Sequence, residues 1–310
     1  MKLRALVFAA FAFLAAAAFF ATRTHAEPDQ VRLIVPGVWF REGDMQQGHC
    51  NNVIIEMKDY LIVVDANYPS GARLAMQECK RISDKPVKYV FDTHHHGDHL
   101  YGNPIWTAGG ATTLAYVGVA EELNRYEPAR WQAAMKSRPD VKATGLDAPQ
   151  PPRQTFDKSP FVLKDGTREV RFYFFGWAHT RGDGFVYLPK EKVLCTGDAV
   201  VNGPHNNTAD ANIGNWPSVI RSAQRLDVQY VLPGHGESGG KELLEGQAQF
   251  MIALHKTVDT AIKDGKKAEG LTVKLPDNVK NWVGKSLDSQ VNDTYREITA
   301  KKPRGDLNTK

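Results

Sequence analysis

The chain contains the stretch Thr93-His94-His95-His96-Gly97-Asp98-His99 directly after an apolar run, Val87 to Phe91, that is typical of a buried strand. Four residues of the stretch fit the spacing H-x-H-x-D-H: His94, His96, Asp98 and His99. Imidazole and carboxylate groups are common ligands of zinc and similar divalent ions. Alternate residues of an extended segment point the same way, so the first two can bind one ion, while the last two, past a glycine, can face a second.

The segments on either side of this stretch predict a layered α/β domain. Four earlier runs are typical of strands: Val31 to Val35, Gly37 to Arg41, Asn52 to Glu56 and Leu61 to Asp65. Ser70 to Ile82 has the apolar spacing of a helix. Later strand patterns occur at Phe161 to Leu163, Arg168 to Phe175, Phe185 to Leu188, Val193 to Thr196 and Tyr230 to Leu232. Further helices are predicted over 216–226, 241–264 and 287–300.

Residues 112–158 interrupt this order and are predicted to form an insertion. Thr113 to Met135 has the composition of one or two helices, which we expect to break near Pro128. Pro139 to Pro152 is rich in proline, glycine and polar residues and predicts a loop. The insertion follows the ligand-bearing stretch, so it is either a lid or wall over the site or a packing excursion without substrate contact.

Three later residues are candidate metal ligands, because each follows an apolar strand and is flanked by glycine: His179, Asp198 and His235. They lie in the segments Gly176-Trp177-Ala178-His179, Cys195-Thr196-Gly197-Asp198 and Leu232-Pro233-Gly234-His235. A single such residue at a strand end is more often a hydrogen-bonded turn residue. Three of them fit a site assembled on loops at one rim of a sheet, where glycine lets the backbone turn sharply and approach the metal.

Together these segments resemble the metallo-β-lactamase superfamily of hydrolases, over about residues 30 to 260. The resemblance implies an αββα sandwich, two mixed sheets packed face to face with helices outside. It assigns a first metal to three histidines: His94, His96 and His179. It assigns a second metal to Asp98, His99 and His235, makes Asp198 the bridge between the metals, and places Asp65 behind the first ligand loop as its support. The expected cofactor is two divalent ions, zinc first, with iron or manganese as alternatives.

The chemistry that this resemblance implies is hydrolysis by a metal-bridged hydroxide, with no serine or cysteine nucleophile. Asp98 would orient the nucleophile and accept its proton. The ligand set is similar to that of glyoxalase II-like thioesterases and lactonases, so we expect an ester, thioester or lactone substrate. Cys195 lies three residues before Asp198 and would point to the opposite face of its strand, into the core.

A β-lactam substrate is the alternative, because Asn207 to Asn212 and Pro233 to Glu237 resemble segments of the lactamases that use a cysteine ligand. In those enzymes the residue matching Asn207 lies near the substrate carbonyl. However, Asp198 stands where they carry the cysteine, and Val201 stands where they place a lysine for the drug's carboxylate. A lost charge-assisted hydrogen bond costs roughly 1.5–3 kcal/mol. A metal-binding or relay protein without turnover is a second alternative, which the complete ligand set argues against.

The first 26 residues predict an export signal. Lys2 and Arg4 precede an apolar run of 17 residues, Ala5 to Ala21, and Thr24-His25-Ala26 has the small-x-small pattern of a cleavage site. We expect cleavage after Ala26 and a periplasmic or secreted mature protein without stable membrane association. An uncleaved membrane anchor is the alternative, since the run is at the short edge of membrane-spanning length.

The composition is that of a globular protein, with 42% hydrophobic and 24% charged residues. The formal charge of +4 falls to about +1 without the three basic residues of the leader, so charge gives no argument for a nucleic-acid partner, and a small-molecule substrate is expected. Three cysteines, Cys50, Cys79 and Cys195, are expected as buried free thiols, with a Cys50–Cys79 disulfide left open. We expect a hydrolase domain over 27–265 and a polar, helical C-terminal tail over 266–310; the oligomeric state is not specified.

Overall fold

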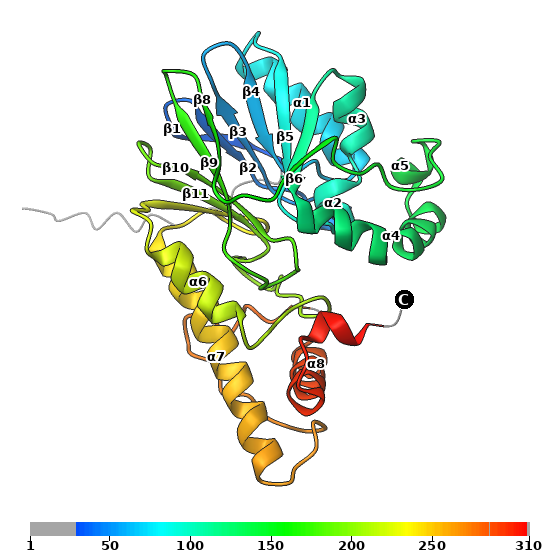
Figure 1. The fold of residues 1–310 in the computed structure, drawn as a ribbon, viewed down its shortest axis with the longest axis vertical. Coiled ribbons are helices and arrows are strands. Elements are labelled where there is room, and N and C mark those ends of the chain that lie inside the picture. The colour runs from blue at the N-terminus through cyan, green and yellow to red at the C-terminus, as the bar shows by residue number, and fades with distance from the viewer. Residues whose placement is uncertain (1–28, 285, 309–310) are drawn as a thin grey trace, which may run out of the picture.

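Two β-sheets pack face to face, with helices on both outer faces, in the computed structural model of the chain (Figure 1). The structure describes residues 29–284 and 286–308. The predicted export signal and its cleavage site therefore lie outside the described residues. The αββα arrangement confirms the predicted fold class.

Within residues 29–284, the first sheet has seven strands in sequence order: β1 (Val31–Val35), β2 (Val38–Arg41), β3 (Asn52–Glu56), β4 (Leu61–Val64), β5 (Val87–Asp92), β6 (Thr112–Tyr116) and β7 (Gln154–Phe156). Strands β1 to β4 are antiparallel, and β4 to β7 are parallel. The second sheet is ordered β12 (Tyr230–Pro233), β11 (Val193–Gly197), β10 (Gly184–Leu188), β9 (Glu169–Phe174) and β8 (Phe161–Lys164). Only its β11–β12 pair is parallel within this described sheet.

The core between the sheets is formed by the inward side chains of both. Val170 and Phe172, two residues apart on β9, are buried, as the alternation of side chains along a strand requires. Phe172 meets Phe91 of β5 across the interface, with ring centroids 4.7 Å apart. Cys195 belongs to this core, which confirms the packing role expected for it.

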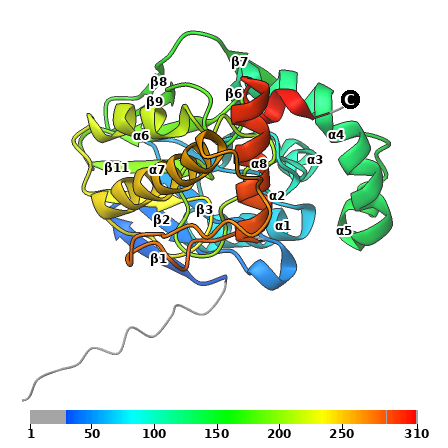
Figure 2. The same cartoon turned by 90° about the horizontal axis from the view of Figure 1, so that it is seen from below.

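Helices cover the outer face of each sheet (Figure 2). On the first sheet, α1 (Pro69–Ile82) and α3 (Asn103–Ala108) bury Ala72, Ala75, Cys79 and Trp106. On the second, α6 (Trp216–Gln224) and α7 (Lys241–Lys263) bury a larger apolar set that includes Trp216, Ile220, Leu244 and Leu254. On α1 and α6 the buried residues named here are three or four positions apart, which puts them on one face of each helix.

The prediction for residues 112–158 was partly wrong. Its first residues form β6 rather than a helix, because a short apolar run beside an open parallel strand pairs with that strand. Helix α4 (Val117–Ser137) then continues through Pro128 without a break. Buried residues on both sides, Tyr126 and Trp131, hold the helix in place despite the missing N–H of the proline. The predicted loop begins with the short helix α5 (Pro139–Lys142).

The segment after α7 folds back onto the second sheet's helices and is named here the C-terminal segment (residues 266–284 and 286–308). It contains α8 (Leu287–Ala300) and a 3₁₀ turn, Arg304–Leu307. Val279, Trp282 and Val291 join the apolar cluster of α6 and α7. The expected polar tail is therefore packed against the rest of the protein.

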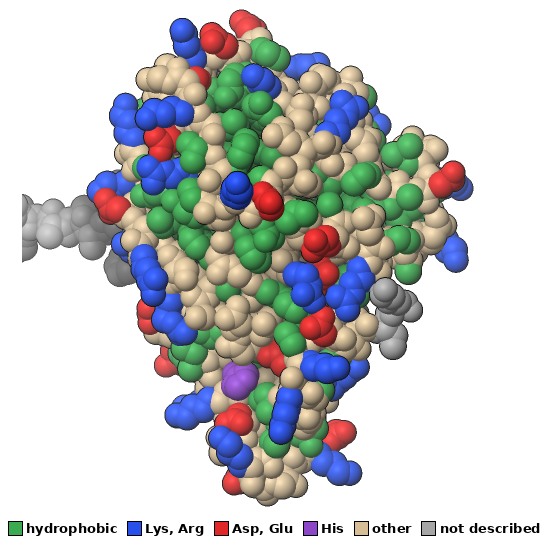
Figure 3. Space-filling model, viewed as in Figure 1, with side chains coloured by type: hydrophobic (Ala, Val, Ile, Leu, Met, Phe, Trp, Pro, Cys, Tyr) green, Lys and Arg blue, Asp and Glu red, His purple; other side chains and the backbone are tan. Residues whose placement is uncertain are grey.

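All three cysteines are buried and free in the structure, so the Cys50–Cys79 disulfide is absent from it. Within the described residues, no helix is both long enough and apolar enough to cross a bilayer. On the face seen in Figure 3, acidic and basic side chains alternate over the surface.

Candidate metal centre

The candidate ligands lie on loops at one rim of the sandwich, where several strands end. The stretch after β5 supplies four of them, with α2 (Gly97–Leu100) starting inside it. His179 lies between β9 and β10, Asp198 follows β11, and His235 follows β12. Residues separated by up to 141 positions, from His94 to His235, are thus brought to one place.

The first ligand set consists of His94, His96 and His179. The Nδ1 atom of His96 lies 3.1 Å from Nε2 of His94 and 3.1 Å from Nε2 of His179. Three ring nitrogens therefore face one point, as a metal ion bound by three imidazoles requires.

The second ligand set consists of Asp98, His99 and His235. The Oδ2 atom of Asp98 lies 3.0 Å from Nε2 of His235 and 3.5 Å from Nε2 of His99. Asp198 reaches both sets, because its Oδ1 lies 3.3 Å from Nε2 of His99 and its Oδ2 lies 3.8 Å from Nε2 of His179. The structure thus places Asp198 where a bridging carboxylate would lie.

Two glycines allow the ligand loops to approach this closely. A Cβ atom at Gly234 would lie 2.1 Å from Oδ1 of Asp198. Gly197 has φ +50°, and a Cβ there would lie 2.4 Å from Oγ1 of Thr93. Any larger residue at either position would push the ligand-bearing loops apart.

The nitrogens that face away from the ligand sets have hydrogen-bond partners in His94, His96 and His179, and the outward nitrogen of His99 forms an ion pair with a carboxylate. Oγ1 of Thr93 lies 3.1 Å from Nδ1 of His94, and Oδ2 of Asp65 lies 2.9 Å from Nδ1 of His99. The backbone carbonyl of Asn207 lies 3.0 Å from Nδ1 of His179, and Oδ2 of Asp210 lies 2.8 Å from Nε2 of His96. Such partners fix the tautomer and leave the lone pair of the inner nitrogen for a metal.

Asp65 lies where the resemblance placed it, behind the first ligand loop. It holds His99 through Oδ2, and its Oδ1 accepts a hydrogen bond of 2.9 Å from the backbone N–H of Thr93. Asp65 has φ +66°, a left-handed conformation that aspartate tolerates better than most residues. The carboxylate thereby ties the end of β4 to the ligand loop that follows β5.

Electrostatics differ between the two sets. Burial lowers the pKa of His96 to about 4, and burial with the neighbouring imidazoles lowers the pKa of His94 well below its usual range. Burial also lowers the pKa of His99, but Cys50, Asp198 and Asp65 outweigh it and raise the pKa well above the usual value. Since burial raises the pKa of Cys50 to about 12, its thiol is neutral at pH 7 and the carboxylates carry this effect.

The carboxylates of this centre stay ionised. Burial raises the pKa of Asp98, but His99 and His235 outweigh it and lower the pKa to about 2. The same two imidazoles hold the pKa of Asp198 well below its usual range. In return, Asp198 and Asp98 raise the pKa of His235 against the effect of its burial.

Asp210 is a supporting residue to which the sequence pattern assigned no role. Besides His96, it binds the guanidinium of Arg130 through both oxygens, at 2.7 and 2.9 Å, and Oδ2 lies 3.3 Å from Nε2 of His95. Glu127 adds a second carboxylate, 3.0 Å from Nη1 of Arg130. His95 is fully buried in this network. Asp210 follows Arg130 by 80 positions, so no local spacing could reveal the pair.

Two cavities open beside the ligand sets. The main cavity, of about 420 Å³, is lined by His96, Asp98, Asp198, His235 and the loop around Asn207. The side cavity, of about 350 Å³, is lined by Asp98, Asn207, Arg130 and Tyr68 among others. The predicted residue Asn207 is exposed and belongs to both walls, and His205 lies on the wall of the main cavity. The predicted insertion lines the side cavity through residues of α4, whereas its proline-rich segment lines neither cavity.

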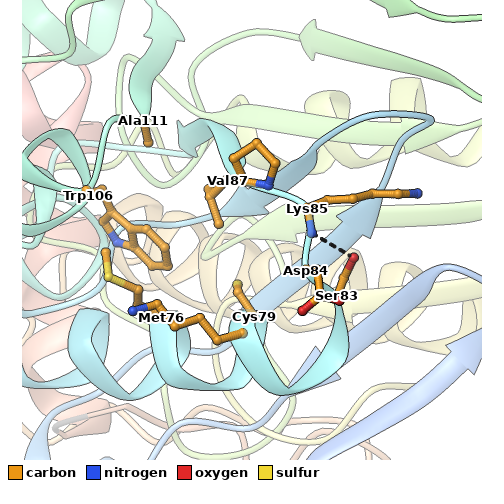
Figure 4. A pocket seen from close by; sticks show the side chains of 11 residues that line it. Met76, Cys79, Ser83, Asp84, Lys85, Val87, Trp106 and Ala111 are labelled. Atoms are coloured by element: carbon orange, nitrogen blue, oxygen red, sulfur yellow. Dashed lines mark hydrogen bonds between the residues drawn. The ribbon is translucent and has the colours of Figure 1, made fainter.

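A third cavity, of about 460 Å³, lies on the outer face of the first sheet (Figure 4). Met76, Cys79, Val87 and Trp106 line it, with a hydrogen bond from the backbone N–H of Lys85 to Ser83 at its edge. It contains no member of either ligand set. Although this cavity is slightly larger than the main cavity, it is therefore not the candidate metal site.

The residues present fit a pair of divalent ions. Imidazole nitrogens and carboxylate oxygens form the donors, and their outer atoms are held by hydrogen bonds. The buried Oδ1 atom of Asp198 makes no hydrogen bond with the described residues, although buried polar atoms normally have a partner. A cation between the sets would satisfy this oxygen.

The αββα fold, together with the imidazole and carboxylate donors at its rim, is that of a metal-dependent hydrolase. The model of the metallo-beta-lactamase superfamily matches residues 45–235, which is more than half of the chain, so the protein belongs to that superfamily.

Named relatives within the superfamily are distant. The chain is 25% identical over 202 residues to the metallo-beta-lactamase type 2 of Bacillus sp. strain 170, covering 63% of this chain and 69% of that protein. It is 31% identical over 116 residues to the metallo-beta-lactamase type 2 of Bacteroides fragilis, covering 36% of this chain and 45% of that protein.

Solved structures match a larger share of the chain. A metallo-beta-lactamase from Pontibacter korlensis is similar with a TM-score of 0.58 and 25% identity, covering 72% of this chain and 98% of that one. The sec-alkylsulfatase Pisa1 from Pseudomonas sp. is similar with a TM-score of 0.68 and 18% identity. This match covers 87% of this chain and 50% of the sulfatase chain. The second likeness supports the fold alone.

Proposed function

We propose that the protein is an exported dinuclear hydrolase that cleaves an ester, thioester or lactone. Two divalent ions, zinc first, would be held by the two ligand sets and Asp198, and would supply an activated water at neutral pH and polarise the bond to be cleaved. The export rests on the leader pattern alone. The bond type rests on the donor set and on the walls of the main cavity.

Asp98 is suited to orient the attacking water. Its side chain is 25% exposed, which is more than that of any other carboxylate of the centre. Asp98 also lines the main cavity. Its low pKa, about 2, keeps the carboxylate ionised at neutral pH, so it can accept a hydrogen bond from the attacking water. Asn207, exposed between the two cavities, can donate from its amide to the carbonyl oxygen of a bound substrate.

One observation carries the choice of substrate: none of the described residues that line the main cavity is a lysine or arginine. Val201, at the position where the resemblance locates a lysine for the drug's carboxylate, is fully buried. Arg130 lines the side cavity but is already paired with Asp210 and Glu127. A carboxylate-bearing lactam therefore lacks a cationic side chain to bind it.

β-Lactam hydrolysis is the second candidate, and the 25% identity to a metallo-beta-lactamase type 2 favours it. The deciding experiment compares kcat/KM for an aryl ester, a lactone and a chromogenic cephalosporin, using zinc-loaded residues 27–310 with and without chelator. We expect chelator-sensitive hydrolysis that is fastest on the ester or lactone. A cephalosporin rate above both would establish a lactamase instead. Two bound metals with no turnover of any substrate would favour the non-catalytic alternative.

A further inference from the structure

An unused hydroxyl group lies on the wall of the side cavity. Tyr68, the residue directly before α1, lines this cavity together with Asp98 and Asn207, which also line the main cavity. Among the described residues, the Oη atom of Tyr68 has no hydrogen-bond partner. Although the side chain is half-buried, this oxygen is accessible, so a molecule in the side cavity can accept a hydrogen bond from it.

Neighbouring polar groups of the same cavity are already paired. Oη of Tyr101 donates a hydrogen bond of 2.5 Å to Oε2 of Glu127, and Oε1 of Glu127 accepts one of 3.0 Å from Arg130. Asn207 uses its Oδ1 for a backbone N–H two residues later, which leaves its amide N–H groups open. The hydroxyl of Tyr68 and the amide of Asn207 are therefore two donors that the chain leaves to a bound molecule.

Packing gives the Tyr68 ring a fixed position. The guanidinium carbon of Arg138 lies 3.6 Å from the centre of the ring, and the Tyr101 ring meets it in a T-shaped contact with centroids 5.7 Å apart. Arg138 is itself held, because it donates to Asp140 at 3.1 and 3.2 Å and to the carbonyl of Gln47 at 3.0 Å. A hydroxyl held in advance can stabilise a reacting group without the cost of ordering its side chain.

The hydroxyl of Tyr68 faces Asp98. Burial raises the pKa of Tyr68, and the carboxylate of Asp98 raises it further, with a larger effect than any other charged residue, Arg138 included. Because electrostatic effects weaken with distance, this ranking places the hydroxyl on the side of the ring toward the metal centre. A phenol is protonated at neutral pH in any case, so Tyr68 acts as a donor.

We propose that Tyr68 is a further catalytic residue whose hydroxyl donates a hydrogen bond to the leaving-group oxygen of an oxygen ester or lactone. The scissile group has two acceptors, and the proposed function already assigns the carbonyl oxygen to Asn207. When the C–O bond breaks, its electron pair stays on the leaving oxygen, and the proton that the alcohol gains comes from the attacking water. Tyr68 keeps its own proton and stabilises the charge that develops on this oxygen.

This role rests on the proposed function and narrows its substrate. Sulfur accepts hydrogen bonds weakly, so the hydroxyl would assist the departure of an alkoxide but hardly that of a thiolate. It would also matter little for a nitrophenolate, whose negative charge is spread over the ring. Tyr68 thus favours alkyl esters and lactones over thioesters within the proposed class.

The kinetic test compares Tyr68→Phe with the wild type on three butanoates that differ in the leaving group. We expect kcat/KM to fall about 10- to 100-fold for methyl butanoate, and less than about twofold for S-methyl thiobutanoate and 4-nitrophenyl butanoate. The control is Tyr89→Phe on β5, which removes the hydroxyl of a half-buried tyrosine packed against Tyr60 and should change none of the rates. An equal loss for all three substrates, or no loss for methyl butanoate, would overturn the role of Tyr68.

A binding experiment separates this role from the proposed function. Methyl butylphosphonate and butyl(ethyl)phosphinate are anions of nearly the same shape that resemble the tetrahedral intermediate, but only the first carries an oxygen at the leaving-group position. In calorimetric titrations of zinc-loaded protein, we expect Tyr68→Phe to weaken binding of the first about tenfold and of the second less than about twofold. That result would support Tyr68 even if no ester were hydrolysed, in which case the proposed function alone fails. Equal weakening of both compounds, or of neither, would overturn the proposal.

Discussion

The two ligand sets lie side by side, but the pKa values of their histidines are shifted in opposite directions. His94, His96 and His179 have lowered pKa values because they are buried among other imidazoles. His99 and His235 have raised pKa values because carboxylates surround them. The first set therefore presents neutral nitrogens at pH 7, whereas the second holds protons that a metal must displace.

The supports of the two sets differ in the same way. Asp65 supports the second set from within the sheet, through His99 and the backbone of Thr93. Asp210 supports the first set from the loop, and Asn308 of the C-terminal segment donates to that same carboxylate at 2.7 Å. The second set thus depends on the β4–β5 framework, while the first depends on contacts made late in the chain.

Asp198→Ala removes the carboxylate that reaches both sets and should have the largest effect. We expect kcat/KM to fall about 1,000-fold, equivalent to ~4 kcal/mol of lost transition-state stabilisation. The fold should persist, because the residue lies on a loop after β11, and circular dichroism would check this. Retained hydrolysis by a folded variant would remove Asp198 from the bridging position.

Asp210→Asn and Asp65→Asn should each weaken the binding of one of the two metals. The change leaves the shape intact but removes the charge that fixes the facing imidazole, so we expect about 10- to 100-fold weaker zinc binding. Asp210→Asn should act on the first set and Asp65→Asn on the second. Competition with a chromogenic chelator measures the two affinities, and equal loss at both metals in either variant would refute the separate supports.

Acidification should release the metals in order. Protons compete with a metal for the nitrogens of His99 and His235, whose raised pKa values keep them protonated at higher pH than an ordinary histidine. Affinity of the second set should therefore fall on acidification by about tenfold per pH unit for each proton that the metal must displace, whereas His96 protonates only near a pKa of about 4. Zinc content after dialysis at pH 7.5 and 5.5 tests this. Loss of the first metal before the second would show the opposite order.

Glu297→Gln should affect stability more than catalysis. Its carboxylate accepts hydrogen bonds from the backbone of Ile213, Gly214 and Arg304, at 2.9, 2.7 and 2.8 Å. An amide supplies only one accepting oxygen, so we expect about 1–3 kcal/mol lower free energy of unfolding. Urea titration measures it, with zinc affinity of the second set as the unchanged control. An unaltered midpoint would mean that these bonds do not anchor the C-terminal segment.

Local patterns were sufficient to predict the parts of this molecule that lie within one loop or strand. The ligand stretch after β5 could be interpreted from spacing alone, and the segments holding His179, Asp198 and His235 from their strand-and-glycine context. The sandwich itself followed from the resemblance that these segments support. Their roles as ligands remain predictions for the experiments above.

Features that depend on distant pairings could not be predicted. Strand β6 was mistaken for helix because its pairing with β5, rather than its composition, decides its structure. Asp210 has no local signal, because its partners Arg130 and His96 lie 80 and 114 residues away. The contribution of the C-terminal segment to the main cavity could not be predicted either, because it depends on contacts with loops far away in the sequence.

The most direct test of the dinuclear account is a zinc titration of metal-free protein with aryl-ester hydrolysis as the readout. The account predicts that the first equivalent fills the neutral histidine set and that most activity appears with the second, at pH 7. Asp198→Ala should show no such rise. Full activity at one equivalent, or activity unaffected by a chelator, would contradict a two-metal centre.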